Sequence, residues 1–254
     1  MEYVQEAGTG ESLQLQAYET IREGILYAKY APGDRLQVKD LCADLDMGRT
    51  PVRESLVRLR QEDLVQTVPQ SGTYVNRISL RSVECARYVR ESLERQVAIE
   101  CCARIDADGE KLLSEIMADA RDACSRHETR LFFDTDNRFH QALYQIAGRE
   151  RIWGWLETLN MDLQRYRWLR VLTEELDWNA IMHQHDEIYD AITHHDVDET
   201  GFLVSNHLHL LFEESGTVTK RFPDYFLLDL PKALRRSQAG TRSVPVSGWR
   251  RPAG

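Results

Sequence analysis

Helical periodicity over most of the chain is the feature that most constrains its fold. From Ser79 onward, apolar side chains recur every three or four residues, and short polar or glycine-containing breaks such as "DADG" and "AGRE" separate the runs. No segment in this region stands out with the period of two that is typical of a β-strand. The pattern predicts an all-helical antiparallel bundle, with helices over 79–104, 110–126, 129–147, 150–170, 174–194 and 197–216.

The region before the bundle begins with two shorter helical patterns. A helix is predicted over 13–29, with Ser12 as its N-cap, and it ends at the turn formed by Pro32 and Gly33. A second helix is predicted over 38–46, where apolar residues again recur on one face.

A third helix and a hairpin complete this first region. Thr50 is the expected N-cap of a helix over 50–63, with Pro51 at the first helical position. Two short β-type runs then flank a turn that contains Gly72, and this pattern predicts a hairpin. The order of helix, helix–turn–helix and β-wing predicts a winged helix–turn–helix.

We therefore expect a mainly α-helical protein with two folded domains. The last residues, from about 232 onward, have no apolar period, which is typical of disorder. The expected segments are a flexible N-terminus over 1–12, a winged helix–turn–helix over 13–78, an all-helical domain over 79–218 and a partly disordered C-terminal tail over 219–254.

The composition favours a cytoplasmic protein with no membrane partner. No apolar run reaches the roughly 18 residues that a membrane-spanning helix needs. The N-terminal stretch "MEYVQEAGTGES" lacks the basic and then apolar pattern of a signal peptide. The five cysteines are odd in number and lack metal-type spacing, which favours reduced thiols.

Arginine is concentrated on the third predicted helix although the chain is acidic. The formal net charge is −9, yet the stretch "DMGRTPVRESLVRLRQEDLV" carries Arg49, Arg53, Arg58 and Arg60. Arginine recognises guanine through two parallel hydrogen bonds, and the N-terminal end of the second helix of a helix–turn–helix reaches the bases. A solvated helix face is the alternative interpretation, but the preceding helix and the following hairpin favour DNA binding.

Three histidines and one aspartate in the bundle have a pattern that suits a metal site. Asp136 and His140 are four residues apart, so both side chains lie on one face of a helix. His185 and His207 lie within the apolar patterns of two later helices. Imidazole and carboxylate groups suit zinc, and they also suit nickel, manganese or iron. From spacing alone, however, the favoured interpretation is a set of hydrogen-bonded core histidines.

The first region resembles the winged helix–turn–helix of the GntR family of bacterial transcription regulators. The resemblance covers residues 15–78 and rests on the stretches "APGDRL", "DMGRTPVRESLVRLRQEDLV" and "QSGTYV". Gly48 and Asp63 stand where the family usually has serine and glycine. The resemblance implies a double-stranded DNA operator as the partner, and we expect the DNA-binding residues to be Arg35, Arg49, Thr50, Arg53 and Gly72.

The bundle resembles the FCD ligand-binding domain of the FadR subfamily. Metal-binding members have D-x-x-x-H on one helix and a histidine on each of two later helices. In this chain those positions are Asp136, His140, His185 and His207. The resemblance therefore favours a divalent metal ion, with zinc preferred over nickel, manganese or iron.

The same resemblance implies where a small ligand would bind. It assigns effector-binding roles to Arg90 and Glu94, although a simple ion pair between two residues four apart on a helix is an equally open alternative. Arg165 is a second candidate for an effector-binding arginine.

These expectations describe a ligand-responsive regulator and not an enzyme. A homodimer would bind a palindromic operator, because a two-fold site doubles the contacts. A small organic-acid or sugar-acid effector, bound at the metal, would release the repressor from DNA. Two alternatives stay open: a regulator with structural histidines and no metal, and a metal-dependent hydrolase.

Overall fold

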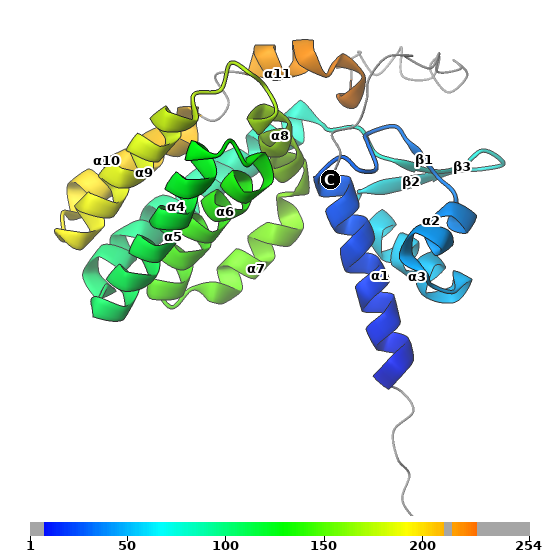
Figure 1. The fold of residues 1–254 in the computed structure, drawn as a ribbon, viewed down its shortest axis with the longest axis horizontal. Helices are drawn as coiled ribbons and strands as arrows, with labels where there is room; N and C mark the ends of the chain where they lie inside the picture. Colours follow the sequence, from blue (N-terminus) through cyan, green and yellow to red (C-terminus); the bar gives the residue numbers. More distant parts are fainter. Residues whose placement is uncertain (1–7, 211–214, 228–254) are drawn as a thin grey trace, which may run out of the picture.

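The computed structural model describes residues 8–210 and 215–227, which form two lobes (Figure 1). We call residues 8–78 the head and residues 79–227 the body. The head contains α1 (Gly8–Leu26), β1 (Arg35–Leu36), α2 (Val38–Leu45), α3 (Arg49–Gln61), β2 (Val65–Val68) and β3 (Gly72–Val75). The body contains α4 (Leu80–Arg104), α5 (Ala107–Ser125), α6 (Thr129–Ile146), α7 (Glu150–Leu159), α8 (Met161–Val171), α9 (Trp178–Thr193), α10 (Val197–Leu210), α11 (Ser215–Arg221) and the 3-10 helix η1 (Pro223–Tyr225).

The head has the predicted winged helix–turn–helix architecture. Its strands form an antiparallel sheet in the order β1-β3-β2, and the β2–β3 hairpin pairs Val65 with Val75 and Val68 with Gly72. The two-residue strand β1, which the sequence pattern did not predict, pairs with β3. Buried side chains from α1, α3 and the sheet form one core, so the arginine-rich helix is held by its apolar face.

Two predicted helix starts in the head are wrong. Helix α1 begins at Gly8, inside the segment expected to be flexible, so Ser12 is not its N-cap. Helix α3 begins at Arg49, and its N-cap is Gly48 and not Thr50. Gly48 has the extended backbone of an N-cap (φ −68°, ψ 166°) but, lacking a side chain, makes no capping hydrogen bond. Glycine is among the residues that are common at this position.

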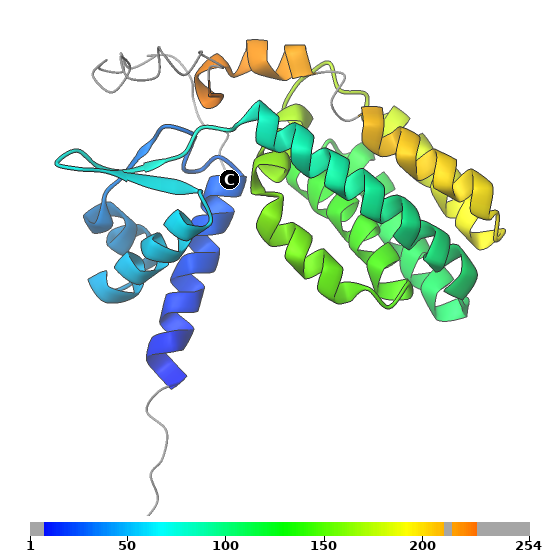
Figure 2. The same cartoon turned by 180° about the vertical axis from the view of Figure 1, so that it is seen from behind.

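The body is the predicted helical bundle, in which α4 packs along α10 (Figure 2). Its core is rich in aromatic residues, among them Phe132, Phe139 and Tyr166. The sequence predicted one helix over 150–170, but the structure has α7 and α8 with Asn160 between them in a non-helical conformation (φ −100°, ψ 16°). Within the region predicted as one helix over 197–216, the described residues contain α10 over Val197–Leu210 and the start of α11 at Ser215.

The segment 215–227, which we call the strap, returns from the body to the start of α4. A parallel bridge joins Ile78 to Phe226, with hydrogen bonds from Ile78 N to Tyr225 O (2.8 Å) and from Leu227 N to Ile78 O (2.9 Å). Most of the strap lies within the tail that the sequence analysis expected over 219–254, while residues 228–254 lie outside the described part of the chain. The strap therefore fixes the connection between head and body.

Direct contacts also hold the two lobes together. The Tyr27 ring packs edge-on against Trp168, with ring centroids 4.9 Å apart, and its hydroxyl donates to Asp134. Arg22 Nη2 donates to the Glu157 carbonyl oxygen at 2.7 Å. Within the described residues, no helix is both long enough and apolar enough to cross a membrane.

Candidate metal centre and DNA-binding surface

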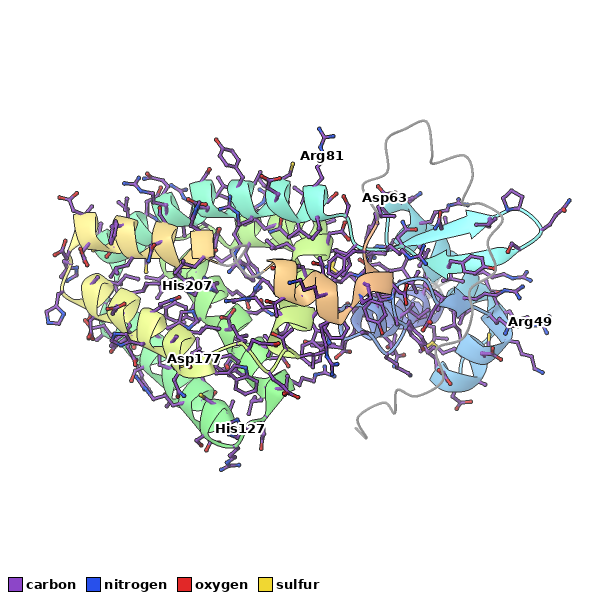
Figure 3. All side chains as sticks on the ribbon, turned by 90° about the horizontal axis from the view of Figure 1, so that it is seen from above. Arg49, Asp63, Arg81, His127, Asp177 and His207 are labelled. Atoms are coloured by element: carbon purple, nitrogen blue, oxygen red, sulfur yellow. The ribbon has the colours of Figure 1, made fainter. Side chains whose placement is uncertain are left out.

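Helix α3 presents its N-terminal arginines on the outer side of the head. Val52 and Leu59 are fully buried, and this apolar face leaves Arg49, Thr50 and Arg53 exposed. Arg49 projects from the side of the head that faces away from the body (Figure 3). Within the described residues, neither Arg49 nor Arg53 has an ion-pair partner. Their guanidinium groups can therefore contact phosphates or base edges.

Arg58, on the last turns of α3, has a different role. Its guanidinium lies 3.6 Å from the centroid of the Tyr18 ring, and its Nε lies 3.4 Å from Glu62 Oε1. Burial and the Glu62 hydrogen bond raise the pKa of Tyr18 to about 12, so its hydroxyl stays protonated at neutral pH. Arg58 thus helps to attach α3 to α1 and is not free for DNA.

The wing brings Gly72 and Arg35 together. Gly72 has a φ of +133°, which only glycine adopts readily. A Cβ at this position would lie 2.8 Å from Arg35 Nε, so the absence of a side chain lets Arg35 lie across the wing. Four of the expected DNA-binding residues are therefore exposed, and Gly72 is half-buried next to one of them, Arg35.

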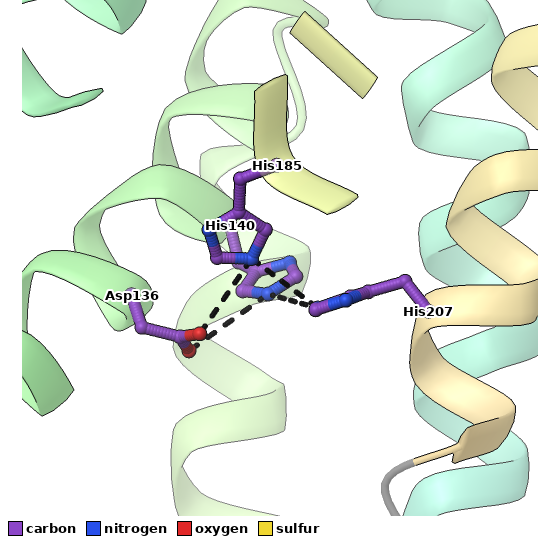
Figure 4. A group of neighbouring side chains, drawn as sticks. All are labelled: Asp136, His140, His185 and His207. Carbon is purple, nitrogen blue, oxygen red and sulfur yellow. Dashed lines mark hydrogen bonds and ion pairs between the residues drawn. The ribbon is translucent and has the colours of Figure 1, made fainter. Parts of the chain in front are cut away.

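The bundle brings the four expected metal ligands together from three helices (Figure 4). Asp136 and His140 come from α6, His185 from α9 and His207 from α10, and their possible ligand atoms all lie within 4.8 Å of one another. The His207 Nε2 atom is 3.3 Å from the Nε2 atoms of both His185 and His140. Asp136 Oδ1 is 3.6 Å from His185 Nε2.

Hydrogen bonds to the other ring nitrogens orient two of these imidazoles. His140 Nδ1 contacts a Glu94 carboxylate oxygen, and His207 Nδ1 contacts Gln184 Oε1 at 2.7 Å. Both partners are acceptors, so we assign the ring proton of each histidine to Nδ1. The two Nε2 atoms then face each other with lone pairs, which is unfavourable without a cation between them.

Burial keeps the three imidazoles in the neutral form that metals bind. It lowers the pKa of His140, His185 and His207, and neighbouring positive groups such as Arg90 lower the pKa of His140 further. Burial alone would raise the pKa of Asp136, but the Arg167 guanidinium and the imidazoles hold it well below its usual range. The donor set is thus one carboxylate and three neutral imidazoles, which fits zinc or a similar divalent ion.

Arg167 is a neighbour of this group that the sequence analysis did not identify. Its Nη2 donates to Asp136 Oδ2, and its Nη1 donates to Asn137 Oδ1 and to Gln164 Oε1, both at 2.6 Å. Burial lowers the pKa of Arg167 to about 10, which leaves it charged at neutral pH. Arg167 therefore holds Oδ2 of Asp136, which also lies 3.9 Å from His140 Nε2, while Oδ1 faces His185.

Arg90 and Glu94 form an ion pair on α4 that is buried beside His140. Arg90 is 1% exposed, and its Nε donates to Glu94 Oε2 at 3.0 Å. Both terminal nitrogens, Nη1 and Nη2, are buried without a hydrogen-bond partner among the described residues. Buried guanidinium donors without partners are costly, so Arg90 is suited to receive an anion.

Arg165 lies elsewhere, at the junction of the lobes. It is 2% exposed, and its Nη2 donates to the Asn76 carbonyl oxygen at 2.5 Å, while its Nη1 lies 3.3 Å from Asp162 Oδ1. The structure therefore does not bring Arg165 together with the histidines. The sequence "RYR" indicates that only one of its two arginines can face the ligands, because residues two apart on a helix point to nearly opposite sides, but it does not indicate which one.

A small cavity leads to the candidate metal ligands. Its volume is about 30 Å³. Aromatic and aliphatic side chains form half of its lining, and the polar half consists of Asp136, His140, Arg167 and Arg170. The arrangement is a buried, neutral-imidazole site with cationic side chains around it, which can hold a divalent ion and an anionic ligand.

The two domains match two known families. Residues 13–75 match the model "Bacterial regulatory proteins, gntR family", and residues 87–210 match the FCD domain. A Streptomyces ambofaciens protein described as an HTH-type transcriptional regulator in an unstable DNA locus is 31% identical over 225 residues, covering 87% of this chain and 92% of that protein. The HTH-type transcriptional repressor RspR of Escherichia coli is 29% identical over 214 residues, covering 83% and 92% of the two chains.

Solved structures share the same fold. Escherichia coli McbR/YncC superposes with a TM-score of 0.70 at 18% identity, covering 83% of this chain and 98% of that chain. A GntR regulator from Rhodococcus sp. RHA1 gives a TM-score of 0.67 at 20% identity, with 83% and 99% covered. A winged DNA-binding head on a helical FCD body defines a transcription regulator and not an enzyme. The chain belongs to the GntR family, and its FCD domain is consistent with the FadR subfamily.

Proposed function

We propose that this protein is a repressor that acts in the bacterial cytoplasm and leaves its operator when a small organic-acid or sugar-acid effector binds. The effector would bind beside a divalent metal ion, zinc first among the candidates, held by Asp136, His140, His185 and His207. The name of RspR, a repressor, supports repression over activation. The head would bind DNA through Arg35, Arg49, Thr50, Arg53 and Gly72.

The observation that carries the metal site is the pair of Nε2 atoms of His140 and His207, 3.3 Å apart. Because Glu94 and Gln184 accept the Nδ1 protons, these nitrogens present lone pairs to each other. A purely structural pair of histidines would instead donate one ring proton to the other ring. The metal supplies Lewis acidity and positive charge when it is bound, and the chain's own Arg90 offers free donors for an effector carboxylate.

A homodimer is the form in which such a regulator would bind a palindromic operator. The exposed face of α4 supports a two-fold contact, because it carries Tyr88, Val89 and Leu93 at 67%, 42% and 36% exposure. Apolar side chains gathered on one outer helix face are typical of an interface. Sedimentation of the Leu93→Glu variant tests this step, since a shift from dimer to monomer is expected.

The central experiment combines metal analysis with operator binding. Protein purified without chelator should contain about one divalent ion per chain, and a screen of organic acids should identify compounds that weaken binding to operator DNA from beside the gene. The variants His185→Ala and His207→Ala should lose both the metal and the response to acids. If both variants retain the full response, the histidines are structural and the effector binds without metal.

A further inference from the structure

We infer that Glu54 is a specificity-determining residue that recognises a cytosine of the operator in the major groove. The inference rests on the proposed function of the head in operator binding and adds a base-recognising carboxylate to the expected contacts. It comes from the position of Glu54 among the exposed side chains of α3, whose sequence RTPVRESLVRLRQ contains no other acidic residue.

The Glu54 carboxylate is free on the surface of the head. Glu54 is exposed, and among the described residues its side chain has no ion pair and no hydrogen bond. The usual partner of a helical glutamate is a basic residue four positions further on, which here is Arg58. Arg58 instead lies over the Tyr18 ring, with its Nε 3.4 Å from Glu62 Oε1. The head therefore leaves one negative charge uncompensated on its arginine-rich helix.

Glu54 lies on one side of α3 together with Thr50 and Val57. Spacings of four and three residues place these side chains on the same face of a helix. Val57 is 46% exposed, and neither its apolar side chain nor a carboxylate can bind a phosphate. Both groups have partners in the major groove, where a carboxylate accepts from cytosine N4 and an apolar side chain contacts the thymine methyl group. This face of α3 therefore suits base edges and not the DNA backbone.

Cytosine is the base that matches a free carboxylate best. An ionised carboxylate only accepts hydrogen bonds. In the major groove cytosine presents the N4 amino group as a donor, whereas guanine and thymine present acceptors and no donor. Adenine presents its N6 donor beside the N7 acceptor, and the lone pair of N7 would repel a carboxylate.

The carboxylate also acts against the wrong sequences. Phosphates repel Glu54 on every duplex, while Arg49 and Arg53 attract every duplex. Only a sequence that offers the cytosine amino group compensates this repulsion. Glu54 should therefore lower general DNA affinity and raise the preference for the operator, which is specificity through an unfavourable contact.

Selection of bound duplexes from a randomised pool, followed by sequencing, tests the inference with the full-length protein. At one base pair we expect cytosine to be preferred by about 5–150-fold, the range that one mismatched base pair usually costs. Glu54→Ala should lose this preference and keep the preferences at the other positions. Glu54→Gln should change the preference from cytosine to adenine, because a glutamine amide binds adenine through two hydrogen bonds. A merely structural glutamate would not produce this change.

Anisotropy titrations at one fixed salt concentration give a second readout, with effects of opposite sign. Glu54→Ala should bind the selected duplex more weakly than the original protein does, and it should bind a random duplex more tightly, because the charge that repels phosphates is gone. Glu19→Gln is the matched control, because Glu19 is exposed on α1 and lines the cleft between α1 and α7. It removes the same charge from the head and should leave the sequence preferences unchanged.

The outcomes separate the inference from the proposed function. If the original protein enriches no sequence, the proposed operator binding is wrong and the inference is overturned with it. If Glu54→Ala enriches the same sequence with the same cytosine preference, operator binding stands and the inference is overturned. An equal loss of affinity on all duplexes would also overturn it, because Glu54 would then only support the fold. Loss of a preference for a different base would overturn the assignment to cytosine.

Discussion

Glu94 and Gln184 are single residues that set the chemistry of the site without being candidate ligands. Each accepts a hydrogen bond from a ring nitrogen and so turns the opposite nitrogen toward the other histidines. Glu94 also pairs with Arg90, so one carboxylate orients a histidine and an arginine at once. Its position explains why a residue expected to contact an effector is fully buried.

The Glu94→Gln variant should lose metal affinity while keeping its shape. An amide is a weaker acceptor for His140 and leaves the Arg90 charge unpaired, so we expect zinc affinity to fall about 10–100-fold. Calorimetric titration with zinc measures this change. Glu100→Gln, on the same helix but paired with Arg149 near the surface, should leave the affinity unchanged. Equal affinities for the two variants would contradict the orienting role of Glu94.

The Arg53→Ala variant should weaken operator binding by about 1–3 kcal/mol if its guanidinium contacts a base. Arg53 is exposed on α3, whereas Val52 and Leu59 on its apolar face are buried. Fluorescence anisotropy with operator and random duplexes measures the change. Arg58→Ala serves as the control, because Arg58 stacks on Tyr18 and should affect DNA binding much less. An equal loss on both duplexes would mean that Arg53 contacts only phosphate.

At the scale of whole elements, helical periodicity predicted most of the body correctly, because each helix buries one apolar face. The break at Asn160 was not predicted, since the sequence has no proline or glycine there and the apolar pattern continues through it. The strap was also missed. Its Ile78–Phe226 bridge depends on two residues far apart in the sequence, and no local pattern reports such a pairing.

Periodicity turned the four candidate ligands toward the interior, and the resemblance to the FCD domain joined them into one expected site, but neither identified Arg167 as their neighbour. A spacing of four residues placed Asp136 beside His140 on one helix face. The apolar residues around His185 and His207 indicated that these two side chains point into the bundle. The choice between Arg165 and Arg167 depended on the rotation of α8 about its axis. That rotation follows from packing against α4 and α6, and a single sequence does not reveal it.

The strap should contribute substantially to stability. Phe226 is 5% exposed and packs in the body core, so Phe226→Ala should cost about 3–5 kcal/mol, the usual range for such truncations. Urea unfolding measures the loss. Leu227→Ala, at a position that is 52% exposed, should cost far less. Similar unfolding midpoints for the two variants would mean that the strap is not part of the folded core.

Over the whole molecule, two helices next to the candidate metal site also hold the head: α6, which carries Asp136 and His140, and α8, which carries Arg167. Asp134 on α6 accepts from Tyr27 of the head, two residues before Asp136. On α8, Trp168 packs against Tyr27 next to Arg167, and Arg165 donates to the Asn76 carbonyl oxygen. A shift of α6 or α8 on effector binding would therefore change the orientation of the head relative to the body. These contacts supply a physical connection between the two proposed sites.

The Tyr27→Phe variant tests this connection with the smallest possible change. It removes the hydrogen bond to Asp134 and keeps the ring contacts with Trp168 and Phe133. Zinc affinity and operator affinity without effector should stay the same, because Tyr27 touches neither site. The ratio of operator affinities without and with effector should fall by about 2–30-fold, which corresponds to roughly 0.5–2 kcal/mol of coupling.

Operator titrations by anisotropy, with and without zinc and an effector from the screen, give this ratio directly. Tyr30→Phe is the matched control, because the Tyr30 hydroxyl donates to Asp44, which also belongs to the head. It should leave the ratio unchanged. If Tyr27→Phe also leaves the ratio unchanged, the coupling between effector and operator binding does not depend on the Tyr27–Asp134 hydrogen bond. The hydrogen bond from Arg165 to the Asn76 carbonyl oxygen is then the next contact to test.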